Sequence, residues 1–275
     1  MSPEAGADHR RLYAAMHAAN GARPSLGVVF VPPLLHEQPR SRRFMTEVAS
    51  GLAARGTPCL RFDFFGTGDS AGGGDAVDFE SMHRDIDVAV AALRARSGVD
   101  RIALFAWRAG ALPAWTWVQR RQVDLLVLWE PIGDGARWLS ELERADARER
   151  EQRPRARPGL RRIDTSGDGQ LMGCAVSPRL RHELAGARLA EGRVSAARLT
   201  AGGTYRPPVW TVARGDAPRL QLDIDRLLPL PADAPTFDSG DMEAPFFMSP
   251  PLERVVDELG RALVEPRMQA ESLCQ

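Results

Sequence analysis

The fold is decided by residues 101–110, which read RIALFAWRAG. The run from Arg101 to Phe105 is short and apolar, as expected of a strand buried on both faces of a sheet. It is followed directly by the pentapeptide AWRAG, whose small residues at both ends let a strand and a helix pass close together in a sharp turn. This stretch therefore predicts a buried strand, a tight turn and a helix, with the side chain of Arg108 directed outward at the turn.

A turn of this outline is typical of a nucleophile elbow, which has the pattern G-x-S-x-G. In this chain the central residue is Arg108. Its guanidinium stays protonated and cannot attack a carbonyl carbon. The sequence thus predicts an enzyme-like turn that lacks the usual nucleophile.

Four further apolar runs have the length of strands, and helical patterns separate them. This alternation predicts βαβ units, a mostly parallel central sheet flanked by helices, and right-handed crossovers. Residues 10–17 add an expected edge strand at the N-terminus. The expected strands are residues 27–31, 58–64, 102–107, 125–129 and 208–213, and the expected helices are residues 42–55, 82–95, 109–120, 176–189 and 252–263.

The composition excludes several classes of function. The chain has 275 residues and a formal net charge of zero, so its overall charge gives no argument for binding nucleic acid. All of its 36 basic residues are arginine, which excludes a Schiff-base lysine and a phosphate-binding Walker lysine. Three widely spaced cysteines predict neither a disulfide framework nor a zinc site. We expect no cofactor and no metal.

The sequence also bears on location and domain organisation. No membrane span or leader is expected from the apolar runs, and the default prediction is a cytoplasmic protein. Residues 135–206 interrupt the alternation with a dense charge run and then glycines. We expect residues 1–134 and 207–275 to form the core, and residues 135–206 to form a cap or lid over the ligand crevice. A merely decorative insertion stays open as an alternative.

Three motifs together resemble the α/β-hydrolase superfamily. The first is the elbow around Arg108. The second is DFFGTGDS at residues 63–70, which resembles the glycine turn after strand four of that superfamily. The third is Pro32-Pro33, at the place where many members form half of the oxyanion hole. The prolines carry no N–H, so Leu34 or a later amide would donate there. The resemblance implies an α/β-hydrolase fold with a cap insertion.

A narrower group shares further residues. Pro32-Pro33, followed by Glu37 and by Ser41-Arg42-Arg43, is similar to the second type of exosortase A system-associated hydrolases. The resemblance covers residues 27–135 and implies a role in bacterial exopolysaccharide export or protein sorting, with a protein partner from that system. His36 stands where these proteins have the first residue of a Glu-Glu pair.

The same resemblance places the remaining members of a catalytic triad. Asp216, which follows the expected strand 208–213, matches the position of the acid. The histidine is missing, because all five histidines lie at or before His182. Asp241 lies near the expected histidine position. Two of the three triad members are therefore replaced, and the usual serine-hydrolase route is not expected.

Arg108 leaves two hypotheses open. In the first, Asp216 or Asp241 pairs with Arg108 and the pair plugs the site. In the second, Arg108 and the amide groups at the helix start, beginning at Ala109, hold an anionic ligand such as a phosphate or a carboxylate. A cation at a helix N-terminus is otherwise disfavoured by roughly 0.3–1 kcal/mol.

Other residues near the predicted crevice are weaker candidates. His36 could reach the site from the oxyanion loop, although a solvated loop histidine is the simpler interpretation. Trp107 is expected at the crevice, and Glu130 follows a strand whose carboxyl end faces it. Cys174 is more simply a buried structural cysteine, and Ser70 is expected to shape its turn.

Three functions follow from this sequence. The protein is either a hydrolase-fold protein that binds a small acyl, sugar or anionic ligand without serine-hydrolase activity, or an active hydrolase or acyltransferase with an unconventional centre, or a structural partner with a filled pocket. The first is the main prediction.

Overall fold

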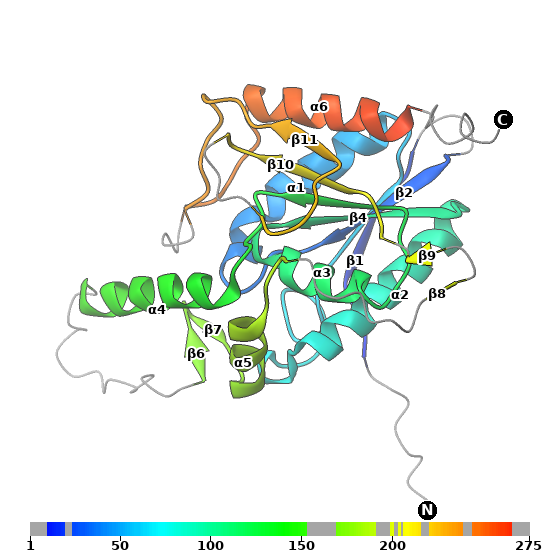
Figure 1. Cartoon of the computed structure of the whole chain (residues 1–275). Coiled ribbons are helices and arrows are strands. Elements are labelled where there is room, and N and C mark those ends of the chain that lie inside the picture. The colour runs from blue at the N-terminus through cyan, green and yellow to red at the C-terminus, as the bar shows by residue number, and fades with distance from the viewer. Residues whose placement is uncertain are drawn as a thin grey trace, which may run out of the picture.

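The computed structural model describes residues 10–19, 24–152, 169–190, 199–200, 203–204, 206–215, 220–238 and 244–265. These residues form one seven-stranded sheet, two small hairpins and helices on both faces of the sheet (Figure 1). The sheet strands are β1 (Ala14–His17), β2 (Leu26–Val31), β3 (Cys59–Phe62), β4 (Arg101–Trp107), β5 (Leu125–Trp129), β10 (Val209–Ala213) and β11 (Arg226–Pro229).

The sheet has the order β1-β3-β2-β4-β5-β10-β11. Every neighbouring pair is parallel except β1 and β3, which are antiparallel. The predicted strands and the N-terminal edge strand are confirmed. The sequence analysis missed β11, whose four residues RLLP are too short for a clear pattern and end in a proline.

The order of the strands locates the predicted crevice. The chain passes from β2 to β3 on one side and then returns past β2 to form β4 on the other side. Ligands of open α/β sheets bind at such a reversal, beyond the carboxyl ends of the strands. The carboxyl ends of β2 and β4 carry Pro32 and Arg108, so the predicted site lies at the reversal.

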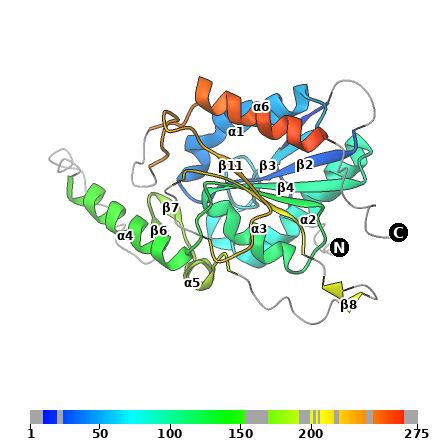
Figure 2. The same cartoon turned by 45° about the horizontal axis from the view of Figure 1, so that its top comes forward.

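Helices cover both faces of the sheet. Figure 2 shows α1 (Glu37–Ala54) and α6 (Pro250–Val264) on one face and α2 (Phe79–Ser97) and α3 (Ala111–Val118) on the other. Helix α1 begins five residues earlier than predicted, because Pro39 is tolerated in a first helical turn and Glu37 is favoured there. Helix α3 is shorter than predicted, because a 3₁₀ turn, η2 (Arg108–Gly110), precedes it.

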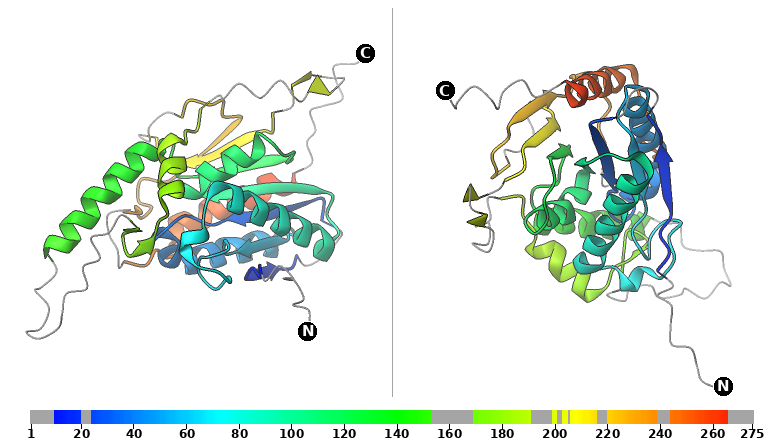
Figure 3. Two further views of the ribbon diagram at one scale, coloured as in Figure 1. Left: turned by 90° about the horizontal axis from the view of Figure 1, so that it is seen from below. Right: turned by 90° about the vertical axis from the view of Figure 1, so that its right-hand side faces the viewer.

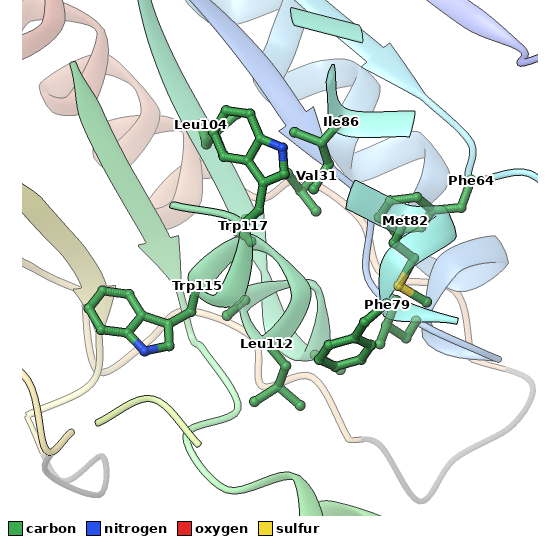
Figure 4. Close-up of a cluster of buried hydrophobic side chains, with 14 of the residues drawn as sticks. Val31, Phe64, Phe79, Met82, Ile86, Leu104, Leu112, Trp115 and Trp117 are labelled. Atoms are coloured by element: carbon green, nitrogen blue, oxygen red, sulfur yellow. The ribbon is translucent and has the colours of Figure 1, made fainter. Parts of the chain in front are cut away.

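The α2 and α3 face is held by a large apolar cluster (Figure 4). Met82 and Ile86 of α2 pack against Val31 of β2 and Leu104 of β4, and all four are at most 1% exposed. Burying each such side chain contributes about 1.5–3 kcal/mol. This packing fixes the strand ends from which the crevice is built.

The segment inserted between β5 and β10 has its own elements. They are α4 (Gly135–Gln152), the hairpin strands β6 (Gln170–Leu171) and β7 (Cys174–Ala175), and α5 (Pro178–Gly186), followed by the hairpin strands β8 (Leu199–Thr200) and β9 (Gly203–Thr204). The start of α5 was predicted correctly, and its N-cap Ser177 accepts a hydrogen bond from the Leu180 N–H at 3.0 Å.

The charge run in this segment was not predicted to be helical, yet its described part belongs to α4. Helix α4 extends away from the sheet (Figure 3). Its base is anchored, because Trp138, Leu139 and Leu142 are buried in the same apolar cluster as α2 and α3. The segment also bonds to α2, where the Phe79 N–H donates to Glu183 at 2.7 Å. Whether this segment acts as a lid stays a prediction.

A short turn connects the core to the inserted segment. The short 3₁₀ turn η1 (Gly74–Ala76) leads from β3 toward α2 and contacts β7. Among the described helices, none combines the length and the apolar character that crossing a membrane requires.

Candidate functional site at the carboxyl ends of β2, β4, β5 and β10

The turn after β4 has the geometry of an elbow. Arg108 has a φ of +52°, in the left-handed region that side chains other than glycine rarely adopt. Gly110 is required two residues later, since an added Cβ would lie 2.3 Å from the carbonyl oxygen of Pro32. The sharp turn predicted from the small residues is therefore present, and it brings β4 against the end of β2.

Backbone strain gathers at this edge of the sheet. Leu35, Arg108 and Glu130 have φ values of 54°, 52° and 41°, and they follow β2, β4 and β5 respectively. Each such residue costs about 1–3 kcal/mol and persists only where its surroundings fix it. The Arg108 carbonyl is fixed by the N–H of Ile132 at 3.2 Å. Strain concentrated at three adjacent strand ends is typical of a functional site.

Arg108 forms an ion pair with Glu37, the first residue of α1. Nη2 of Arg108 lies 3.5 Å from Oε1 of Glu37, and the two side chains are 15% and 0% exposed. The Arg108 guanidinium also lies 5.3 Å from the centre of the Phe237 ring. Glu37 was noted in the sequence only as part of a family motif, and its role as the counter-charge was missed. Asp216 and Asp241 lie outside the described residues, so their pairing with Arg108 stays a prediction.

A second ion pair lies beside the first. Nε of Arg214, which follows β10, is 3.5 Å from Oε1 of Glu130, and the side chains are 20% and 12% exposed. Burial raises the pKa of Glu130 above its ordinary value, while the charges of Arg108 and Arg214 lower it part of the way back. We call Arg108, Arg214, Glu37 and Glu130 the crevice cluster.

The start of α1 lies shortly after the carboxyl end of β2. The carbonyl of Leu34 accepts a hydrogen bond from the Glu37 N–H at 3.2 Å. His36 is the residue before α1 and is 4% exposed, so it is not the solvated loop histidine of the simpler interpretation. Ala109 is fully buried at the start of η2. Leu34 and His36 lie between β2 and α1, Ala109 follows Arg108, and their contact with a ligand stays a prediction.

Trp107 does not line the crevice, which corrects the sequence-based expectation. Its side chain is 0% exposed and packs against Phe44, Phe237 and Phe246, with ring centres 5.0–5.5 Å apart. Alternation along β4 explains the difference, because Trp107 points to the α1 and α6 face while its neighbour Arg108 begins the turn. Trp107 is a support beneath the site.

Arg40 of α1 anchors the segment between β11 and α6 at two of its residues. Its Nη1 donates to the Asp238 carbonyl at 2.7 Å, and its Nε donates to the Ala244 carbonyl at 2.8 Å. Its guanidinium also lies 4.2 Å from the centre of the Phe237 ring. Arg40 and Arg108 therefore both contact Phe237. The sequence analysis did not single out Arg40.

The glycine turn after β3 is structural. Asp63 accepts hydrogen bonds from Gln38 Nε2 at 2.8 Å, Arg42 Nη2 at 2.9 Å and the Asp69 N–H at 2.9 Å. Ser70 Oγ donates to the Asp63 carbonyl at 2.6 Å, which supports the prediction that Ser70 shapes its turn. Gln38 and Arg42 belong to α1, so the turn fixes the helix that carries Glu37.

The polar groups of the crevice cluster form two ion pairs, Arg108 with Glu37 and Arg214 with Glu130. No histidine occurs after position 182 in the sequence, and among the described residues no group of three or more His, Cys, Asp or Glu side chains could hold a metal ion. Cys174 is partly buried, and burial raises the pKa of its thiol, which disfavours a nucleophilic thiolate. The cluster can bind and orient a polar group, and it presents no serine or cysteine at the elbow.

This architecture, a mostly parallel seven-stranded sheet with an elbow after β4, is an α/β-hydrolase fold. Solved structures of that fold are similar over nearly the whole chain. A putative hydrolase from Agrobacterium vitis S4 matches with a TM-score of 0.56 and 18% identity, over 94% of this chain and 95% of that chain. Est1E from Butyrivibrio proteoclasticus, bound to ferulic acid, matches with a TM-score of 0.53 and 15% identity, over 93% and 94%.

Other similarities are partial. An α/β serine hydrolase homologue from Coxiella burnetii is 22% identical with a TM-score of 0.39, over 44% of this chain. This chain spans only 58% of the length of that homologue. No family model and no curated protein matches the sequence. Because the sequence identities are all low, the comparisons establish the fold alone.

Proposed function

We propose that this protein binds a small acyl or anionic ligand at the crevice cluster and does not act as a serine hydrolase. The observation that carries the proposal is the ion pair of Arg108 with Glu37 at the elbow. A permanently charged guanidinium occupies the place of the nucleophile. A carboxylate ligand could compete with Glu37 for Arg108, because guanidinium groups bind carboxylates through paired hydrogen bonds.

Ferulic acid is a suitable probe, since Est1E, which has the same fold, is described with this aromatic acid bound. We expect ferulate to bind to this protein in a calorimetric titration and methyl ferulate not to be hydrolysed. A fluorophosphonate reagent should leave the protein unlabelled. Turnover of the ester, abolished by a substitution in the crevice, would overturn the proposal in favour of an active enzyme with an unconventional centre.

Two variants separate the roles of the charges. Arg108→Gln should weaken ferulate binding by about tenfold or more, because a hydrogen bond to a charged group contributes about 1.5–3 kcal/mol. Glu37→Gln should strengthen binding, because it removes the competing carboxylate. Arg101→Gln is the matched control, since Arg101 begins the same strand and pairs with Asp124 at the other end of the sheet.

A filled pocket is the second candidate, and one observation favours it. The crevice cluster contains two arginines and two glutamates, so its formal charge is balanced without a ligand. In that case the protein would act through its surface, and ferulate would bind to none of the variants. Equal binding by the unchanged protein and by Arg108→Gln would also contradict a ligand site at Arg108.

We further propose a place in bacterial exopolysaccharide export or protein sorting. The proposal rests on the resemblance carried by Pro32-Pro33, Glu37 and Ser41-Arg42-Arg43. Two of these residues have a task in the structure, since Glu37 pairs with Arg108 and Arg42 bonds to Asp63. Co-purification of the tagged protein with components of such a system from its source would support this placement, and their absence would contradict it.

A further inference from the structure

A second charged groove lies away from the crevice cluster, between α1, the edge strand β1 and its neighbour β3. Its volume is about 530 Å³, within the range of small-molecule sites. None of the crevice cluster lines it. It is lined by Tyr13, Arg42, Arg43, Thr46, Glu47 and Arg61.

Arg61 is the unusual residue of this groove. It lies in the middle of β3 and is half-buried on the face that α1 covers. Its Nε donates to Nε2 of His17 at 3.1 Å. Within the described ranges, no carboxylate oxygen lies within 4.0 Å of its guanidinium nitrogens, whereas Arg42 and Arg43 both have such partners. Arg61 therefore contributes a positive charge that the described protein does not neutralise by direct contact.

Charges of both signs surround Arg61, and the nearby carboxylates are paired with other arginines. Arg42 pairs with Asp63 and Asp69, and Arg43 pairs with Glu47. Burial lowers the pKa of Arg61, and the neighbouring charge of Arg42 lowers it further, against the opposing influence of Tyr13 and Asp63. A half-buried cation in this setting is costly unless an anion accompanies it.

The hydrogen bonds of His17 show which nitrogens of Arg61 remain available to a ligand. Because Arg61 donates to Nε2, that nitrogen of His17 accepts, and Nδ1 lies 3.1 Å from Oγ of Ser50. Burial and the charge of Arg61 lower the pKa of His17. The imidazole therefore orients Arg61 as a neutral acceptor and leaves the terminal amino groups of the guanidinium for another ligand.

Tyr13 adds an aromatic side chain to the lining of the groove. Its side chain is 38% exposed, and the guanidinium of Arg42 lies 5.3 Å from the ring centre. The groove thus combines an arginine fork with an aromatic face. An arginine fork matches the oxygens of a phosphate, and an aromatic face stacks on a ring.

We propose that the groove between α1 and β1 binds a small phosphorylated molecule, with its phosphate on Arg61 and its ring against Tyr13. The exposed Tyr13 ring lines the groove together with Arg61, so we expect the ligand to carry a ring as well as a phosphate. This site is distinct from the crevice cluster and does not depend on the function proposed there.

The test uses the full chain with two probes, inorganic phosphate and phenyl phosphate, in calorimetric titrations. Phenyl phosphate should bind more tightly than phosphate. Arg61→Gln should weaken the binding of both by about tenfold or more, since a charged hydrogen bond of about 1.5–3 kcal/mol is lost. Tyr13→Ala should weaken only phenyl phosphate. Equal affinities of both probes with no effect of Tyr13→Ala would overturn the aromatic half of the proposal.

Two controls are matched to this design. Arg55→Gln removes the arginine that directly follows α1, which pairs with Asp257 and does not line this groove, and should leave both affinities unchanged. Arg108→Gln should also leave them unchanged, which separates this site from the crevice. Failure of the unchanged protein to bind either probe, or undiminished binding by Arg61→Gln, would overturn the proposal.

A readout on the unchanged protein guards against misfolding of a variant. The imidazole resonances of His17 should shift when phenyl phosphate is added, because His17 accepts a hydrogen bond from Arg61. His182, on α5, should not shift. A purely structural Arg61 predicts no shift of His17, and it also predicts that Arg61→Gln lowers the thermal midpoint, whereas a ligand-binding Arg61 predicts an equal or higher midpoint.

Discussion

At the scale of single residues, Arg108 and Glu37 form an ion pair at the turn after β4. Glu37 is fully buried, while Arg108 keeps 15% exposure. The two members of the pair therefore differ in their exposure to water. Removing the cation leaves a buried carboxylate that water does not reach, whereas removing the carboxylate leaves an arginine that still touches water.

This inequality gives a stability prediction. Arg108→Gln should lower the free energy of unfolding by about 3–5 kcal/mol, the usual cost of breaking a buried ion pair from one side. Glu37→Gln should cost less, and the double variant should cost less than the sum of the two. Urea unfolding of the four proteins measures the cycle. Additive effects would show that the two residues do not interact.

Gly110 allows the turn after β4 to lie close to the end of β2, because glycine has no Cβ. In Gly110→Ala the new methyl group would lie 2.3 Å from the Pro32 carbonyl oxygen, so β2 and β4 must separate. We expect a loss of about 1–3 kcal/mol or more, as for overpacking of a core. The control is Gly186→Ala in α5, where an added Cβ meets nothing within 4 Å. If both substitutions cost the same in thermal unfolding, the close approach is not what requires Gly110.

Glu130 makes a prediction about pH. Its pKa is raised by burial, so the ionised form is disfavoured in the folded protein compared with the unfolded chain. This penalty is absent below the ordinary value of 4.5 and complete above the raised pKa. Glu130→Gln should therefore be more stabilising, relative to the unchanged protein, at pH 7 than at pH 4. Unfolding curves at the two pH values measure this, and a benefit that shrinks as pH rises would contradict it.

The residues also show the limit of sequence reasoning. Arg108 was found because its motif is local and its neighbours are contiguous. Glu37 and Arg40 were not recognised, since their partners lie 71 and about 200 residues away and no spacing rule connects them. Trp107 was misplaced because its position beside Arg108 was weighed above the alternation of β4, which turns it to the face with Ala103 and Phe105.

At the scale of elements, α1 organises the crevice. Successive positions of its first two turns bind different parts of the site, with Glu37 on Arg108, Gln38 and Arg42 on Asp63, and Arg40 on the loop after β11. The buried strands were predictable because a parallel sheet covered on both faces needs continuous apolar runs. Helix α4 and strand β11 could not be predicted in this way, because α4 is highly charged and β11 is very short.

The Arg40 contacts give a prediction about the loop after β11. Arg40→Gln removes donors to two backbone carbonyls, Asp238 and Ala244, on either side of a short stretch of chain. We expect a loss of about 2–3 kcal/mol and faster proteolysis between these two residues. Arg55→Gln, directly after the same helix, should leave the cleavage rate unchanged. Equal cleavage of both variants in limited proteolysis would mean that Arg40 does not hold the loop.

At the scale of the whole molecule, we ask whether the segment between β5 and β10 folds independently of the sheet. The sequence predicted a separate cap from its composition. In the structure the described part of this segment buries side chains in the same cluster as α2 and α3, including Trp138, Leu171 and Leu184. A unit that shares its apolar core with the sheet cannot unfold alone without exposing that core.

We therefore expect one cooperative unfolding transition for the whole chain. Trp138 of α4 is 1% exposed, and Trp138→Ala should cost about 3–5 kcal/mol, the range for truncating a buried aromatic side chain. Because the core is shared, the substitution should lower the midpoint of the single transition. Calorimetry, with circular dichroism and tryptophan fluorescence followed on the same samples, measures this. A separate early transition that moves in Trp138→Ala while the main transition stays in place would show that the segment folds as an autonomous cap.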